Sequence, residues 1–249
     1  MTEPRKPRVI FWDIETSYSI GAYFDKYREN NILETLQDWF LLSFAYKVQG
    51  ESKIHVHTLA DYPGYSKNLT NDKALVTDLH RLVFSPDTTC LVAHNGDKFD
   101  SRKAKARFLA HNLPPTPPIK TIDTLKLFRR ITKMDSNKLE DIALYFGLGG
   151  KVEHEGKGLW KKCMQGDRDA HRRMAAYNKH DVHLLEQVYD RIIPWHPNPP
   201  VLRHGPGCAH CGSTKAQSRG FNLAKASRTP RFQCLDCHGW YSGQREKAA

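Results

Sequence analysis

Two acids, Asp13 and Glu15, lie at the end of an apolar run that begins at Val9 and is typical of a buried strand. The two-residue period of a strand places both carboxylates on the same face. Neighbouring carboxylates repel each other, and an apolar sheet tolerates such a pair when a cation compensates the charge. Oxygen ligands on a rigid strand favour Mg²⁺ or Mn²⁺. The alternative is a strand end whose acids only reach solvent.

A second candidate pair lies in a long helix near residue 180. Tyr177 and Asp181 are four residues apart, so they project from one helix face a single turn from each other. The same face continues with Leu184 and Val188, which predicts that it packs on the sheet and that Asp181 points inward. A buried carboxylate must be paired, protonated or bound to metal. The alternative is an exposed acid near Lys179.

A further acid, Asp100, follows a predicted strand over Thr89–Ala93 and precedes a predicted helix over Arg102–His111. From such a position a side chain can reach the end of the neighbouring strand. Cys90 within the strand is expected to be buried and without chemistry.

Four of the six cysteines form two Cys-x2-Cys pairs with 22 residues between them. This spacing is typical of a zinc ribbon, in which each pair supplies two thiolates to one structural Zn²⁺. A module this small buries little core, so zinc binding is expected to supply its folding free energy. The four predicted ligands are Cys208, Cys211, Cys234 and Cys237.

The net charge is +11, and more than half of it is carried after residue 195. Basic side chains that alternate with aromatic ones suit the phosphates and bases of nucleic acid. Docking of another protein on the ribbon is the alternative. The residues of this segment that we expect to contact nucleic acid are Lys215, Arg219, Phe221, Arg228, Arg231 and Trp240.

Several residues beside the acids are further candidates for nucleic-acid contact. Trp12 and Phe99 flank acids and are predicted to stack on terminal bases, with core packing as the alternative. Asn95 braces the turn before Asp100 or touches the substrate backbone. The helix after Asp100 carries a basic run, in which Arg102 and Lys103 are expected to contact phosphate, with a solvated face as the alternative. The run consists of Arg102, Lys103, Lys105 and Arg107.

The other elements follow from hydrophobic periodicity and turn residues. Residues 17–37 are predicted to form an insertion with helical stretches, in which Tyr18, Tyr23, Phe24 and Tyr27 cover the sheet edge. A polar, glycine-rich loop is expected over Lys151–Trp160. The remaining predicted elements are a strand pair over Trp39–Val48 and Lys53–Leu59, a helix capped near Asp72, a strand over Ile119–Ile122, and helices over Asp123–Arg129, Lys138–Phe146 and Asp167–Ile193.

Length and composition indicate one full α/β domain over residues 1–195, a proline-rich linker over 196–204 and the ribbon over 205–249. The apolar runs are too short to cross a bilayer, and the first residues lack the apolar segment of a signal peptide. We therefore expect a non-secreted, cytoplasmic protein without a membrane partner.

Three motifs together resemble the DEDD 3′→5′ exonucleases. They are Asp13-Ile14-Glu15-Thr16, Asn95-x3-Phe99-Asp100 and Tyr177-x3-Asp181, in that order and on suitable predicted elements. Tyr177 resembles the tyrosine branch, which includes the proofreading domain of family B DNA polymerases, because Ala176 fills the position of the histidine branch. The segments at Asp123-Thr124-Leu125 and Lys138–Ala143 are similar to linking segments of the same superfamily.

The resemblance implies an α/β, RNase H-like fold with a mixed five-stranded sheet flanked by helices. It also implies that Asp13, Glu15, Asp100 and Asp181 hold two Mg²⁺ or Mn²⁺ ions and that Tyr177 orients the attacking water. Two such ions can bind the attacking and the leaving oxygen of a phosphodiester and lower the pKa of the water.

The sequence thus predicts a two-metal 3′→5′ exonuclease acting on single-stranded or frayed DNA ends, with a polymerase or another replication or repair protein as a candidate partner. No residue can be identified that reads a 2′-hydroxyl, so RNA stays open as a substrate. The alternatives are a structure-specific endonuclease on branched or flap DNA, and a nucleic-acid-binding protein that cleaves little.

Overall fold

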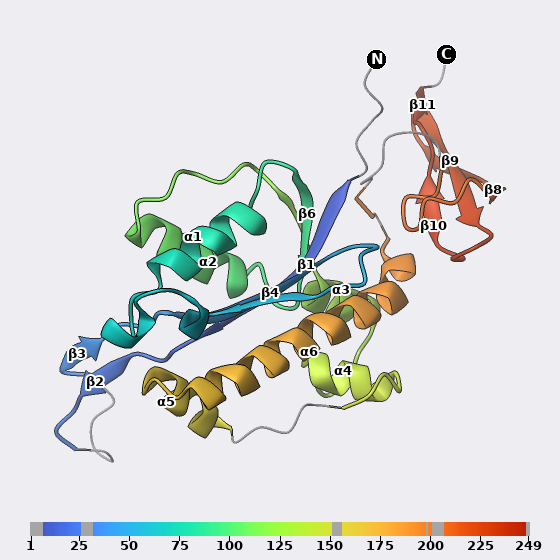
Figure 1. Cartoon of the computed structure of the whole chain (residues 1–249). Helices are drawn as coiled ribbons and strands as arrows, with labels where there is room; N and C mark the ends of the chain where they lie inside the picture. Colours follow the sequence, from blue (N-terminus) through green and yellow to red (C-terminus); the bar gives the residue numbers. More distant parts are fainter. Residues whose placement is uncertain (1–6, 26–31, 151–155, 198, 201–206, 248–249) are drawn as a thin grey trace.

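The computed structural model describes residues 7–25, 32–150, 156–197, 199–200 and 207–247 of the 249-residue chain. Its centre is a five-stranded sheet in the order β5-β4-β1-β6-β7 (Figure 1). β1 and β4 are antiparallel, as are β4 and β5, whereas β1, β6 and β7 are parallel. The strands are β1 (Arg8–Thr16), β4 (Leu41–Val48), β5 (His55–Thr58), β6 (Thr88–Ala93) and β7 (Lys120–Asp123).

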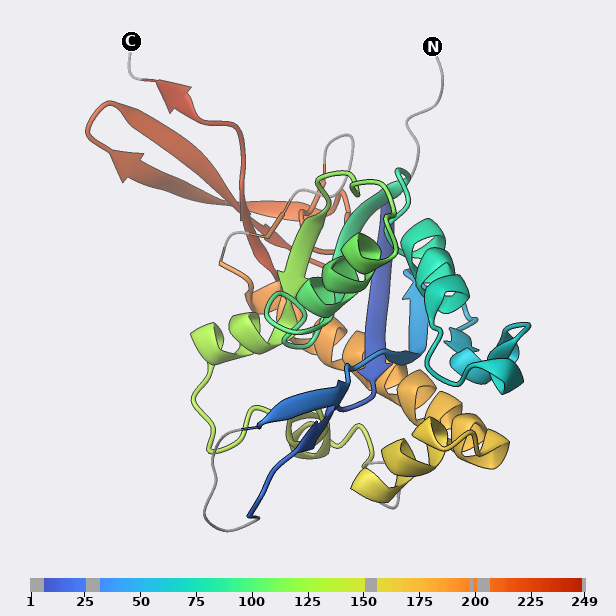
Figure 2. The same cartoon turned by 90° about the vertical axis from the view of Figure 1, so that its left-hand side faces the viewer.

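Helices cover both faces of this sheet, with α1 and α2 on one side and α6, α3 and α4 on the other (Figures 1 and 2). The longest helix, α6, contacts β4, β1 and β5. The helices are α1 (Lys73–Leu82), α2 (Asp100–Ala110), α3 (Thr124–Ile131), α4 (Leu139–Tyr145), α5 (Lys157–Met164) and α6 (Arg168–Ile192). None of the described helices combines the length and the apolar character needed to cross a membrane.

The strand period of β1 decides which way its acids point. Ile10 and Trp12 belong to the core on the α1 and α2 side, whereas Val9 and Phe11 belong to the core that α6 covers. Because alternate residues share a face, Asp13 and Glu15 continue the second set. The two acids therefore face the helix that carries Tyr177 and Asp181.

The insertion after β1 differs from its prediction. Instead of helical stretches, β2 (Ile20–Ala22) and β3 (Glu34–Gln37) form a separate two-stranded sheet. Ser17 explains its course, because its N–H donates to the Phe40 carbonyl at 2.9 Å and its Oγ accepts from the Phe40 N–H at 2.8 Å. This clamp brings the two ends of the insertion together.

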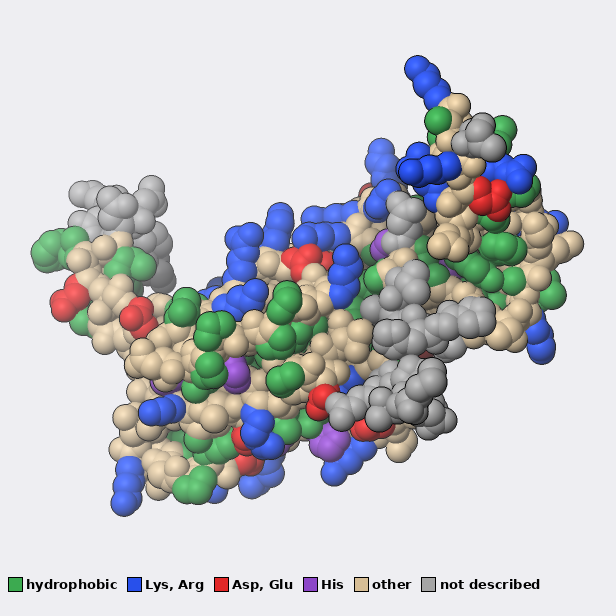
Figure 3. Space-filling view, turned by 90° about the horizontal axis from the view of Figure 1, so that it is seen from above, with side chains coloured by type: hydrophobic (Ala, Val, Ile, Leu, Met, Phe, Trp, Pro, Cys, Tyr) green, Lys and Arg blue, Asp and Glu red, His purple; other side chains and the backbone are tan. Residues whose placement is uncertain are grey.

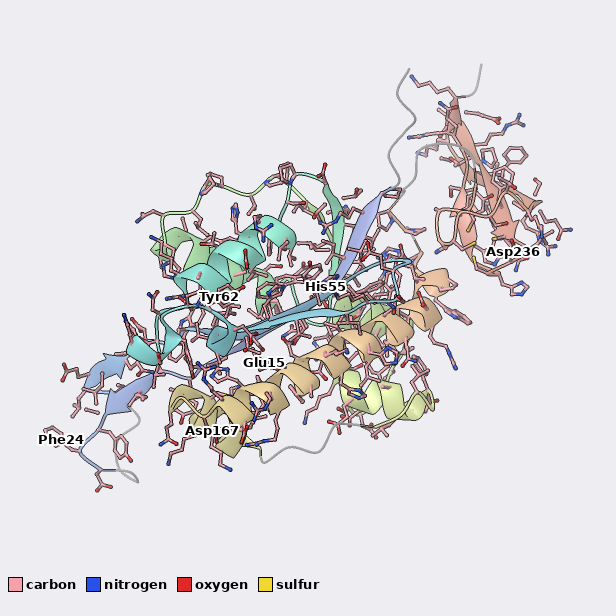
Figure 4. The ribbon with its side chains drawn as sticks, in the orientation of Figure 1. Glu15, Phe24, His55, Tyr62, Asp167 and Asp236 are labelled. Atoms are coloured by element: carbon pink, nitrogen blue, oxygen red, sulfur yellow. The ribbon has the colours of Figure 1, made fainter. Side chains whose placement is uncertain are left out.

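The aromatic side chains of the insertion consequently do not cover the sheet edge. Tyr18, Tyr23 and Phe24 are 43%, 58% and 86% exposed. Phe24 lies at the outer end of the insertion (Figure 4). Tyr27, the fourth aromatic residue of the prediction, lies outside the described residues.

The predicted loop over 151–160 is also corrected. Residues 151–155 lie outside the described part of the chain, and helix α5 begins at Lys157. Leu159 and Cys163 are buried one turn apart and attach α5 to the core. That apolar spacing is helical and overrides the local glycines.

After α6, a 3-10 turn over Ile193–Trp195 leads to a second, smaller sheet at the end of the chain (Figure 1). In it, β9 pairs with each of the other three strands. Its strands are β8 (Ala216–Ala224), β9 (Ser227–Cys234), β10 (Trp240–Ser242) and β11 (Glu246–Lys247). The predicted fold class is confirmed, since the mixed five-stranded sheet is flanked by helices and followed by a small four-cysteine module.

Candidate active site

Three carboxylates meet between β1 and α6. One oxygen from each of Asp13, Glu15 and Asp181 lies within 4.8 Å of the other two. Figure 4 shows Glu15 in the layer between strand β1 and helix α6. The structure thus brings together acids that are up to 168 positions apart in the sequence, and their oxygens form a donor set that suits a hard divalent cation.

The fourth acid, Asp100, reaches β1 from the start of α2. Its side chain is 2% exposed, and its Oδ1 accepts a hydrogen bond of 3.2 Å from the Ile14 N–H, between the two acids of the strand. Asp100 lies outside the set of oxygens within 4.8 Å of one another, but its charge still acts on Asp13. It borders the three-acid cluster from the α2 side.

Burial and mutual repulsion make these acids hard to ionise together. Burial raises the pKa of Asp13 well above its usual range, and the charges of Asp100, Glu15 and Asp181 raise it further. Burial and the Asp181 charge raise the pKa of Glu15 to about 8. Burial likewise raises the pKa of Asp100 to about 7, with a smaller effect from Asp123. A bound cation would remove this repulsion, so the acids fit the divalent metals that the sequence predicts.

Asn178 is a site residue that the sequence did not reveal. Its side chain is fully buried, its Nδ2 donates to Asp13 Oδ2 at 2.6 Å, and its Oδ1 accepts from Ser43 Oγ at 3.1 Å. Ser43 lies opposite Glu15 in the register between β1 and β4. The chain Ser43, Asn178, Asp13 therefore holds the Asp13 carboxylate in place through its Oδ2.

Trp160 of α5 was also missed, because it was assigned to a loop. Its indole Nε1 donates to Glu15 Oε2 at 3.2 Å, and its ring packs edge-on against Tyr177 with centroids 5.9 Å apart. Burial and the charges of Asp181, Glu15 and Asp13 raise the pKa of Tyr177 further above its ordinary value. Tyr177 therefore stays a neutral phenol, which can donate a hydrogen bond.

Of the two aromatic residues predicted to stack on bases near the acids, one is buried and the other is exposed. Trp12 is 1% exposed and packs edge-on against Phe84 at 5.1 Å, so the prediction that it stacks on a base is wrong. Its even position in β1 turns the indole into the core on the α1 and α2 side. Phe99 is 40% exposed beside Asp100, and Lys103 Nζ lies 3.7 Å from the centroid of the Trp39 ring.

Asn95 adopts the left-handed conformation, with φ 63°, at the turn between β6 and α2. Its N–H donates to Asp123 Oδ1 at 3.0 Å and its carbonyl accepts from the Phe99 N–H at 3.0 Å. Both bonds use the backbone, so Asn95 shapes the turn that presents Asp100. Asp123 in turn caps α3, because its side chain accepts from the N–H groups of Leu125 and Lys126.

The basic run on α2 is not uniformly available for phosphate. Arg102 and Lys105 are exposed and Lys103 is half-buried. Arg107 instead turns inward, where its guanidinium binds the fully buried Asp72 together with His111. In the view of Figure 3, several Lys and Arg side chains gather along the upper edge of the face that α1 and α2 cover. The described part of this surface is therefore basic beside Asp100.

The second sheet holds the four cysteines. One Sγ from each of Cys208, Cys211, Cys234 and Cys237 lies within 4.8 Å of the others. The His210 N–H donates to Cys208 Sγ at 3.4 Å. Burial raises the pKa of Cys234, but the N–H groups of Cys237 and Asp236 outweigh this and lower it to about 7. Four converging thiols with such donors form a donor set that suits Zn²⁺.

The basic and aromatic residues of this sheet stack on each other in pairs. The guanidinium of Arg231 lies 4.9 Å from the Trp240 ring centroid, and that of Arg228 lies 4.6 Å from the Phe221 centroid. Trp240 is 43% and Phe221 is 42% exposed. Arg219 donates to Gln233 on the neighbouring strand, and Lys215 lies 3.7 Å from Asp236.

A comparison with known protein families shows to which of them the chain belongs. The sequence model of the RNase H superfamily matches residues 35–193, which is more than half of the chain. The chain belongs to the RNase H superfamily. The matched segment contains Asp100 and Asp181 and begins after the strand that carries Asp13 and Glu15.

None of the curated proteins matches this chain. Among solved structures, the superfamily fold is shared with the family B DNA polymerase from the hyperthermophilic archaeon Pyrobaculum calidifontis, with a TM-score of 0.55 and 17% identity. The likeness covers 78% of this chain and 26% of the polymerase, so the chain spans about a quarter of that protein. At this identity the likeness concerns the RNase H fold alone.

Proposed function

We propose that this protein is a metal-dependent 3′→5′ exonuclease of the DEDD type, in its tyrosine branch, that removes nucleotides from single-stranded or frayed DNA ends. The observation that carries the proposal is the convergence of Asp13, Glu15 and Asp181 within 4.8 Å, with Asp100 bonded to the strand between the first two. Membership of the RNase H superfamily supports it.

Asp13, Glu15, Asp100 and Asp181 would hold two Mg²⁺ or Mn²⁺ ions. Such ions supply an activated water and stabilise the negative charge that develops during phosphodiester hydrolysis. The raised pKa values of Asp13, Glu15 and Asp100 agree with this role, because ligands that repel one another gain most from a cation.

The other residues of the site would orient the attacking water, hold the carboxylates and contact the substrate. Tyr177 stays protonated beside Asp181 and would orient the attacking water by hydrogen bonding. Asn178 and Trp160 donate to Asp13 and Glu15, and so hold these carboxylates in place. Phe99, half exposed beside Asp100, is positioned to stack on a terminal base, and Arg102 and Lys103 to bind phosphate.

We also infer that residues 1–195 and 205–249 are separate domains joined by a short linker, and that the second binds one structural Zn²⁺ through its four cysteines. The exposed Trp240 and Phe221, each stacked on an arginine, suit single-stranded nucleic acid. Replacing Trp240 by Ala should weaken binding of a single strand by about 1–3 kcal/mol. Leu223→Ala, an 83% exposed control on the same sheet, should bind like the wild type in a fluorescence anisotropy titration.

The nuclease proposal is tested with 5′-labelled single-stranded, duplex and flapped DNA and RNA in Mg²⁺ or Mn²⁺. A ladder of products shortened stepwise from the 3′ end supports the exonuclease. Discrete internal cuts would favour an endonuclease on branched or flap DNA. Binding without cleavage under either metal would leave a nucleic-acid-binding protein on the exonuclease fold.

A further inference from the structure

One outer edge of the large sheet is formed by the short strand β5, which pairs with β4 on its inner side. Within the described residues, no strand pairs with its outer side. A groove of about 500 Å³ lies between β5 and helix α6, which contact each other; His55, on β5, is labelled in Figure 4. An unpaired edge presents backbone groups on which another chain can form hydrogen bonds.

The hydrogen bonds of β5 show which backbone groups point to this open edge. The Thr58 N–H donates to Asp61 Oδ2 at 2.7 Å, so it does not serve the pairing of Thr58 with Ser43 on β4. Bonded and non-bonded pairs alternate in an antiparallel ladder, so the pair of Val56 with Ala45 is non-bonded as well. The N–H and the carbonyl of Val56 therefore point away from β4, to the open edge.

Aromatic stacking holds the edge strand in place. The His57 ring stacks on Phe44 and the His55 ring stacks on Tyr46, with ring centroids 4.7 Å and 4.8 Å apart. Phe44 and Tyr46 belong to the core on the α1 and α2 side, so both stacks lie on that face. A strand that is already fixed loses little conformational entropy when a second strand pairs with it.

The opposite face of β5 forms one wall of the groove. Ile54 and Val56 pack against the core that α6 covers and are half-buried. Across from them α6 contributes Ala175 and Ala176, whose short side chains leave space beside the edge of the strand. The groove thus combines an apolar lining with a free backbone edge, and these are the two features by which a sheet edge binds an extended polypeptide.

The charge of the groove indicates what kind of polypeptide it binds. Lys53 and Lys179 line it and are exposed, and within the described residues neither forms an ion pair. No Asp or Glu is among the described residues that line it. Pairing of two β5 edges from two copies of this chain would gather four lysines at one place, and like charges disfavour such an arrangement. A segment that carries acids is favoured for the same reason.

We propose that the β5 edge binds an extended, acidic segment of a partner protein, which adds a strand to the large sheet. The backbone of that segment bonds to the N–H and the carbonyl of Val56, and its apolar side chains fill the groove against α6. Its acidic side chains pair with Lys53 and Lys179. This surface is separate from the cluster of acids, and the inference does not rest on the nuclease function proposed above.

The test selects peptides on the full chain without Mg²⁺ or Mn²⁺. Random twelve-residue peptides displayed on phage are enriched on the immobilised protein, then synthesised and titrated by fluorescence anisotropy. Val56→Pro removes the outward N–H, which the pairing with β4 does not use. Lys53→Glu with Lys179→Glu reverses the charge of the groove. The control is Lys73→Glu with Lys133→Glu, two exposed lysines that do not line the groove.

We expect the enriched peptides to carry Asp or Glu and to bind about tenfold more weakly to Val56→Pro and to the charge-reversed groove pair. The control pair should change by less than about twofold, since exposed charges away from the groove are screened by salt. A bound peptide should slow the hydrogen exchange of the Val56 amide. Binding of a 20-nucleotide single strand of DNA should be the same in Val56→Pro as in the wild type.

The melting temperature of each variant shows whether it is folded, and if Val56→Pro does not fold, the charge-reversed pair and the exchange of the Val56 amide decide. Enrichment of peptides without acids, or equal losses in the groove and control pairs, would overturn the proposal. Wild-type peptide affinity in the charge-reversed pair or in folded Val56→Pro would do the same. A loss of single-strand binding in Val56→Pro would assign the groove to nucleic acid and overturn it as well.

Discussion

Asp13 is half-buried beside three other carboxylates, and its side chain accepts a hydrogen bond from the amide of Asn178. At neutral pH its charge is opposed by burial and by its neighbours. Such a residue costs stability in the metal-free protein and is useful only when a cation is bound.

Replacing Asp13 by Asn should therefore separate stability from activity. The amide keeps the shape and can still accept from Asn178, but it removes one repelling charge and one metal ligand. We expect nuclease activity to fall by at least about 10²–10³-fold. The melting temperature without divalent metal at pH 8 should rise by about 2–4 °C, which corresponds to about 1 kcal/mol. A purified variant with near wild-type turnover would contradict the assignment of Asp13.

Asn178 offers a second test at this scale. Removing its amide in Asn178→Ala leaves Asp13 free to rotate, and loss of such a supporting hydrogen bond typically costs about 10–100-fold in metal affinity or activity. Calorimetric titration with Mn²⁺ measures the affinity directly. Ser43→Ala, which removes only the far end of the chain of hydrogen bonds, should have the smaller effect. Unchanged Mn²⁺ affinity in Asn178→Ala would show that the bond is structural only.

At the residue level, strand period placed Asp13 and Glu15 on one face and helix spacing did the same for Tyr177 and Asp181, because both are local patterns. That these acids share one site was implied only by the resemblance to the DEDD exonucleases. Asn178 and Ser43 were not predictable in this way. Their contact depends on the register between β1 and β4 and on how α6 crosses them, and no local pattern encodes either. The stacking prediction for Trp12 used only its closeness to Asp13 in the sequence, whereas the two-residue period of a strand places neighbouring side chains on opposite faces.

Among the elements, the central strands and α6 follow their predicted ranges closely, since each carries a clear apolar period. The insertion after β1 and helix α5 did not. The insertion forms a pair of strands because Ser17 and Phe40 hold its two ends together, and this contact joins residues 23 positions apart. Helix α5 was hidden by glycines and lysines, although Leu159, Trp160 and Cys163 have helical spacing.

The second sheet provides a prediction about an element that depends on metal. β8 exposes almost all of its side chains and β9 buries only its first and last residues, so little apolar core holds the strands together. Treating the protein with a chelator should abolish the amide hydrogen-exchange protection of β8 and β9 while β1 and β6 stay protected. Cys211→Ser should have the same effect without a chelator. Protected β8 and β9 amides in metal-free protein would contradict a zinc-dependent module.

For the whole molecule, the raised pKa values predict how stability depends on pH. The usual pKa values are 4.5 for Glu15 and 3.8 for Asp100, and in the folded protein they rise to about 8 and about 7. Between these limits the folded state holds protons that the unfolded state has released, so the free energy of unfolding decreases as pH rises. The melting temperature without Mg²⁺ or Mn²⁺ should thus be lower at pH 8 than at pH 6.

Added Mn²⁺ should offset this loss, because it replaces the protons, and its stabilising effect should grow from pH 6 to pH 8. Glu15→Gln provides the control, since it removes one titrating group and should flatten the dependence in the metal-free protein. A Mn²⁺-induced shift in melting temperature that stayed constant over this range would indicate that the metal binds elsewhere.

The account as a whole depends on acids from β1, α2 and α6 sharing bound cations at one place in the fold. Anomalous diffraction from a crystal soaked in Mn²⁺ tests this most directly. We expect Mn²⁺ peaks bound by the carboxylates of Asp13, Glu15 and Asp181, with Asp100 beside them, and their loss in Asp13→Asn. Density that placed Mn²⁺ away from these carboxylates, or left them without a cation at saturating Mn²⁺, would contradict the account.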